Sequence, residues 1–158
     1  MSSFTQTLKE FLYLSNKAGY AGGDAKKWIA ESDGSTTIPF AYKQWKSHDN
    51  FFGGEPYGGR VVVFYDNKPV WIMVYYGWVK EGTDPDMVYE ILREALMHMP
   101  NEYPYRGPEK YTKNTFTYHN TWHGAVDRFS GEEIIQKEKE LLYKANYLGG
   151  FVDQRKGV

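Results

Sequence analysis

The chain has 158 residues, a net charge of −1, no cysteine and an aromatic fraction of 18%. The missing cysteines exclude disulfide scaffolds, thiolate zinc sites and cysteine nucleophiles. The balanced charge does not favour nucleic-acid binding, which depends mostly on clustered cationic side chains. There is no apolar run of about 18 residues and no signal-peptide pattern, so we expect one cytoplasmic domain over residues 1–158, without a membrane partner.

The first predicted element is a helix from Phe4 to about Ala18, because apolar residues recur there at helical spacing. Gly19 supplies a plausible end. A strand is expected from Ile38 to Lys46. No internal repeat, low-complexity stretch or linker is evident along the chain.

The centre of the chain predicts a hairpin. Its strands run from Arg60 to Tyr65 and from Pro69 to Val79, and the turn is Asp66–Lys68. The second strand is apolar on both faces, one carrying Val70, Ile72, Val74, Tyr76 and Trp78 and the other carrying Trp71, Met73, Tyr75 and Val79. Such a strand is usually central and covered on both sides. We therefore expect each face to be shielded from water by another layer, a partner chain or a ligand.

A second helix follows the hairpin. Thr83–Asp86 offers a capping residue, a first-turn proline and two carboxylates at the positive end of a helix. From Met87 to Met99 the apolar residues form one stripe, which Pro100 ends. We expect this stripe to pack on one face of the Pro69–Val79 strand.

The C-terminal half begins with a loop rich in rigid residues, Tyr103–Pro108. Alternation over 115–122 predicts a strand, with 125–129 as its hairpin partner across Gly124. Residues 132–148 fit either a helix or a hairpin, and residues 153–158 are expected to form a frayed tail. The predicted fold is α+β: a twisted, mostly antiparallel sheet of five to seven strands with two main helices packed on it.

Five short segments lie in order along most of the chain: YAGG at 20–23, DNFFGG at 49–54, KPVW at 68–71 with YYG at 75–77, PYRGP at 104–108 and YLGG at 147–150. Together they resemble an uncharacterised bacterial and archaeal family of domains of unknown function. Its members occur alone and behind Xre-type helix-turn-helix domains. In relatives the C-terminal part is a hairpin with a clear turn dipeptide, which Lys137–Glu140 lacks. The resemblance favours a hairpin over 132–148 and implies no reaction.

No motif predicts a cofactor or a metal. His119 and His123 have a spacing that binds zinc on a helix, but on a strand residues four apart lie roughly 13 Å apart. His48 and Asp49 are the residues that an enzyme of unrecognised class could use, although neighbours on an extended chain point in opposite directions. There is no serine-hydrolase elbow and no nucleotide-binding glycine motif.

The leading hypothesis is a domain that binds or senses a small molecule without catalysis. Arg106, in the rigid loop, is suited to anchoring a carboxylate or phosphate. Aromatic side chains would line a ligand-binding cleft beside Arg106, or the same rings would simply form the core. The candidate ligand-binding residues are Trp71, Tyr75, Tyr105, Arg106, Tyr118 and Trp122. The alternatives are an enzyme that uses His48, Asp49, Tyr105 or Arg106, and a protein-interaction or homodimerisation module.

Overall fold

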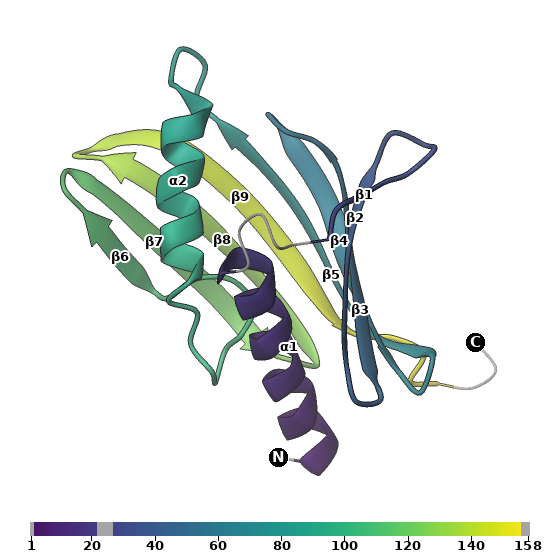
Figure 1. The fold of residues 1–158 in the computed structure, drawn as a ribbon. Coiled ribbons are helices and arrows are strands. Elements are labelled where there is room, and N and C mark those ends of the chain that lie inside the picture. The colour runs from purple at the N-terminus through teal and green to yellow at the C-terminus, as the bar shows by residue number, and fades with distance from the viewer. Residues whose placement is uncertain (1, 22–26, 156–158) are drawn as a thin grey trace.

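The computed structural model describes residues 2–21 and 27–155, which form two helices and nine strands (Figure 1). The elements are α1 (Ser3–Ala21), β1 (Ile29–Ala30), β2 (Thr36–Tyr42), β3 (Trp45–Gly53), β4 (Tyr57–Tyr65), β5 (Lys68–Val79), α2 (Pro85–Leu96), β6 (Lys110–Lys113), β7 (Phe116–Ala125), β8 (Arg128–Lys137) and β9 (Glu140–Phe151). All strand pairs are antiparallel, in the order β1-β2-β3-β4-β5-β9-β8-β7-β6.

Both helices lie on the same face of the curved sheet (Figure 1), which we call the helix face. Leu8 and Phe11 of α1 pack with Trp71 of β5, whereas Ile91 of α2 packs with Tyr143 of β9. The predicted cap of α2 is present, because the Asp84 carboxylate accepts a hydrogen bond from the backbone N–H of Asp86 (3.1 Å). The α+β class and the two helices predicted from the sequence are therefore confirmed.

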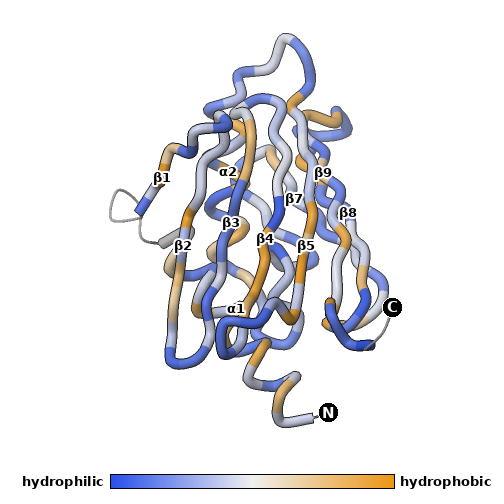
Figure 2. The backbone as a smooth tube through the Cα atoms, turned by 90° about the vertical axis from the view of Figure 1, so that its right-hand side faces the viewer, coloured by the Kyte–Doolittle hydropathy of each residue, from blue (hydrophilic) through white to orange (hydrophobic). Residues whose placement is uncertain are grey.

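Strand β5 is central, as predicted, with four strands on either side in the sheet order. Its helix face is buried at Trp71, Met73 and Val79. Its other face, which we call the outer face, leaves Val74 38% and Tyr76 56% exposed. Figure 2 views the strands β2–β5 with the helices behind them. Among the described residues, the expectation that both faces of β5 are shielded from water is confirmed for the helix face and wrong for the outer face.

The two halves of the sheet repeat one another. Each half has a helix and a four-strand meander, α1 with β2–β5 and α2 with β6–β9; the short β1 is an extra edge strand of the first half, and the halves meet where β5 pairs with β9. Equivalent positions carry equivalent residues: Gly59 opposes Tyr75, and Gly131 opposes Tyr147. The repeat is missed in the sequence because few residues besides these glycines and tyrosines match.

The described residues form nine strands rather than five to seven, because one turn is not visible in the sequence and two strands are very short. The predicted strand 38–46 is a hairpin, in which β2 and β3 are separated by Lys43 and Gln44. Lys43 has a φ of 55°, a left-handed conformation that glycine or asparagine usually signals. Strands β1 and β6 are short, with 2 and 4 residues, and were also missed.

The C-terminal region is all strand. Residues 132–148 form the hairpin of β8 and β9, with Glu138 in the left-handed region at the turn (φ 56°), as the family resemblance implied. The predicted partner strand 125–129 is wrong, because the turn falls at Val126 and Asp127 and β8 continues to Lys137. Gly22 and Gly23 of the YAGG segment, and the end of the expected tail 153–158, lie outside the described residues.

No helix in the described ranges is both long enough and apolar enough to cross a membrane.

We predict that Gly131→Ala destabilises the protein by about 1–3 kcal/mol, the usual cost of overpacking a core. A Cβ at Gly131 would lie 2.1 Å from Cζ of the buried Tyr147 ring, which therefore has to move. Urea unfolding measures the change. Gly54→Ala is the matched control, since a Cβ there meets nothing within 4 Å. Equal stability of the two variants would contradict the prediction.

Candidate functional site

The β3–β5 meander brings Asp49 and Tyr75 together. Both side chains lie on the helix face, and the strand between them carries Gly59 opposite Tyr75. The Tyr75 side chain reaches across β4 toward Asp49 on β3. Its hydroxyl donates a hydrogen bond to Oδ1 of Asp49. The register of two hairpins thus places a carboxylate beside a phenol.

The loop between α2 and β6 delivers Arg106 to the same region. Its Nε donates to Oε1 of Glu133 on β8 at 2.6 Å, and the two side chains are 7% and 0% exposed. The guanidinium carbon also lies 5.7 Å from the centre of the Tyr75 ring, a cation–π distance. Arg106 is therefore buried between Glu133 on β8, with which it forms an ion pair, and the ring of Tyr75.

Further hydrogen bonds satisfy Glu133 and its surroundings. Oε2 of Glu133 accepts from the Tyr118 hydroxyl at 2.5 Å, and that hydroxyl accepts from the backbone N–H of Gly107 at 3.1 Å. Asn120 donates to the carbonyl of Gly107 and accepts from Tyr147 at 2.6 Å. These bonds fix the Arg106 loop to β7, β8 and β9, so the position of Arg106 is set by the sheet.

The tyrosine hydroxyls of this region remain protonated near neutral pH. Burial raises the pKa of Tyr57 above its usual value, and the hydroxyl of Tyr57 is hydrogen-bonded to that of Tyr143. Burial, followed by the nearby Glu133 carboxylate, raises the pKa of Tyr118 and Tyr143 well above the usual range. Burial and a hydrogen bond to Glu55 raise that of Tyr89. None of these phenols is tuned to act as a phenolate base.

Several of these groups line one cavity of about 340 Å³, between α2 and strands β2–β5. We call it the aromatic cleft. Its wall includes Asp49 and Arg106, and Leu92 and Leu96 of α2. The rings that line it are Trp28, Phe51, Tyr57, Tyr75 and Tyr89. It combines an apolar wall with a few fixed polar groups, which is the usual composition of small-molecule sites.

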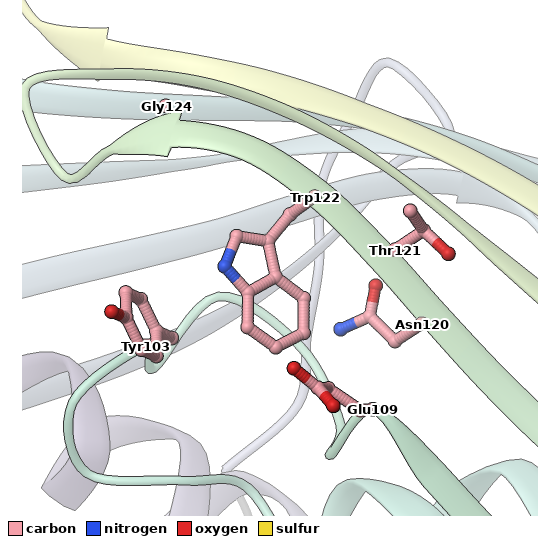
Figure 3. Close-up of a pocket in the computed structure, with 6 residues that line it drawn as sticks. All are labelled: Tyr103, Glu109, Asn120, Thr121, Trp122 and Gly124. Atoms are coloured by element: carbon pink, nitrogen blue, oxygen red, sulfur yellow. The ribbon is translucent and has the colours of Figure 1, made fainter.

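Two other cavities lie nearby. One, of about 280 Å³, is between α1 and β2 and shares Ile38 and Asp49 with the aromatic cleft, so the two cavities are neighbours along the helix face. The other, of about 490 Å³, is a groove beside β7. Figure 3 shows Trp122 between Tyr103 and Glu109 there. This β7 groove is larger, but its polar wall is mostly exposed, whereas the aromatic cleft reaches the buried Arg106.

The structure divides the residues that the sequence proposed as a ligand site. Tyr75 and Arg106 line the aromatic cleft, whereas Trp122 lines the β7 groove. Trp71 is core: it is 1% exposed, stacks on Phe129 and donates from Nε1 to the carbonyl of Val126 at 2.8 Å.

Tyr105 and Tyr118 are also buried in the core. The Tyr105 ring stacks on Phe129 with centroids 4.3 Å apart. Burial raises the pKa of Tyr105 to about 12. Its buried hydroxyl has no hydrogen-bond partner in the part of the chain that the structure describes.

His48 and Asp49, proposed as an alternative enzyme site, are not brought together. His48 is exposed on the outer face and contacts the ring of Phe64, whereas Asp49 lies on the helix face. Their positions follow from the alternation of an extended strand. His119 and His123 both lie on strand β7, and no group of three metal-ligating residues occurs among the described residues.

Sequence reasoning missed Glu133, the most buried charged residue of the site. One signal was present in the sequence. If the segment is a strand, Glu133 lies on the same face as Phe129 and Ile135, so a carboxylate falls on an otherwise apolar face. With residues 132–148 left open between helix and hairpin, this face could not be assigned. The cleft rings Trp28, Phe51, Tyr57 and Tyr89 carried no comparable signal.

Comparison with known proteins gives one family. The model described as "Domain of unknown function (DUF5680)" matches residues 49–152, which include every strand from β4 to β9 and the cleft residues Asp49, Tyr75 and Arg106. The resemblance to an uncharacterised domain family is thereby confirmed. No curated protein and no solved structure matches the chain.

We predict that Arg106→Met lowers the free energy of unfolding by about 3–5 kcal/mol, because it leaves Glu133 buried without its partner. Arg106→Met combined with Glu133→Gln should recover part of the loss, since glutamine is uncharged and can still accept from Tyr118. Urea unfolding measures both. Lys80→Met, which breaks the exposed pair with Glu140, is the control and should cost far less, because water screens this pair. Similar costs for the two single variants would refute the prediction.

Proposed function

We propose that this chain, which belongs to the DUF5680 family of domains of unknown function, binds a small organic molecule in the aromatic cleft without converting it. The observation that carries the proposal is a cavity of about 340 Å³ whose wall combines five aromatic rings with Asp49 and Arg106. That volume falls within the roughly 300–1,000 Å³ typical of ligand pockets.

The polar groups of the cleft favour binding over catalysis. The Arg106 guanidinium is held by Glu133, and the Tyr75 hydroxyl donates to Asp49. The raised pKa values of Tyr57 and Tyr89 keep these phenols protonated near neutral pH. Groups fixed in this way orient a ligand, whereas a general base needs a pKa near the working pH.

A fragment screen by thermal shift tests the proposal. A ligand present at ten times its Kd stabilises the folded state by about 1.4 kcal/mol. In a domain of this size that raises the Tm by about 3–6 °C. We predict that Ile38→Trp, which fills the cleft from β2, abolishes the shift. Ile134→Trp, on the outer face of β8, should keep it. A ligand that binds all three proteins alike does not occupy this cleft, and a screen without any ligand contradicts the function.

A second candidate function, self-association, is favoured by the outer face. Val74 of β5 pairs with Leu148 of β9, and beside them Tyr76 is also exposed; the exposures are 38%, 58% and 56%. Apolar residues that lie together in the middle of an uncovered sheet often mark an interface. The occupant that we propose for this patch is a second copy of the same face, because closed dimers usually bury the same patch of both chains.

Sedimentation over a range of concentrations tests self-association. We predict that the wild type forms dimers at tens of micromolar and that Leu148→Lys is monomeric, because a charge then lies at the centre of the apolar patch. Leu14→Lys is the matched control, since Leu14 is also an exposed leucine (39%) but lies on α1. A wild type that remains monomeric throughout would end this candidate.

A further inference from the structure

We infer that the ligand of the aromatic cleft is an uncharged molecule with a flat ring, and this inference rests on the proposed binding function. Three features of the wall support this inference: the arrangement of the rings, the ion pair of Arg106 with Glu133, and the position of Arg106 above the Tyr75 ring.

The rings of the wall are tilted against one another and do not form a closed stack. Tyr57 lies 5.9 Å from Tyr75 and 5.9 Å from Tyr89, with interplanar angles of 53° and 68°. Trp28 meets Phe51 edge to face, with centroids 5.6 Å apart. Edge-to-face and offset contacts are the geometries in which aromatic rings attract one another. A flat ligand that packs against these rings in the cleft can therefore continue the same kind of contact.

An anionic ligand is disfavoured by the ion pair. The positive charge of Arg106 is already balanced by Glu133, and a carboxylate or phosphate that takes the Nε donor has to displace this residue, which has no exposed surface of its own. A buried carboxylate left without its partner is strongly destabilising. Asp49, in the same wall, adds repulsion. The anchoring of an anion by Arg106, expected from the sequence, is therefore not the recognition that we propose.

A cationic ligand is disfavoured by the protein's own cations. The Arg106 guanidinium already lies over the Tyr75 ring, so a ligand cation that approaches this ring meets a like charge. Arg93 of α2 also lines the cleft. An anion is thus repelled by Asp49 and a cation by Arg93 and Arg106, whereas an uncharged ligand meets no electrostatic repulsion.

Two triads of similar shape and different charge test the inference by isothermal titration calorimetry with the full chain. One is indole-3-acetamide, indole-3-acetate and tryptamine, and the other is benzyl alcohol, phenylacetate and benzylamine. We expect the neutral member of at least one triad to bind ten-fold or more tightly than both charged members. Ile38→Trp should remove that binding, and Ile134→Trp should leave it unchanged.

The possible outcomes distinguish a failure of the inferred ligand class from a failure of the proposed binding function. A charged member that binds as tightly as its neutral partner overturns the neutral class but leaves small-molecule binding standing. The flat-ring inference also fails when neither triad binds while the fragment screen finds another ligand that Ile38→Trp blocks. When no compound of the triads or of the screen binds, the proposed function itself fails.

Discussion

The buried pair of Arg106 and Glu133 is the interaction on which the architecture of the site depends. Burying a carboxylate in a sheet with no exposed surface is tolerated only when a cation and hydrogen-bond donors surround it. The loop after α2 must therefore run along the helix face to deliver Arg106, and Tyr118 must direct its hydroxyl to the same carboxylate. The path of that loop places Arg106 in the wall of the aromatic cleft beside Leu92 and Leu96.

A second constraint concerns the many aromatic residues of the helix face. Side chains directly opposite on neighbouring strands are only about 4.5–5.5 Å apart at Cβ. A large ring that extends across a neighbouring strand therefore needs a glycine opposite. Gly77 makes this room for Tyr57, and Gly131 makes it for Tyr147. The rings can then lie along the sheet, so the cleft is lined by ring surfaces.

Local patterns in the sequence were sufficient for the helices and for the central hairpin. The apolar stripe of α2, the capping carboxylate of Asp84 and the continuous apolar run of β5 can each be recognised within a short segment of the chain. The strand number was underestimated because the turn at Lys43 has no glycine, proline or asparagine to mark it. Of the cleft, the sequence identified Tyr75 and Arg106, whose residue types stand out within their own segments.

By itself the sequence determined the α+β class, the central place of β5 and the opposite directions of His48 and Asp49, because alternation and capping are properties of neighbouring residues. Only the tertiary structure decided that Arg106 meets Glu133, that Trp71 is core and that Tyr75 reaches Asp49. Those contacts join segments far apart in the chain, and they depend on strand order and register. Periodicity along a chain shows which face a residue occupies but not which strand lies beside it.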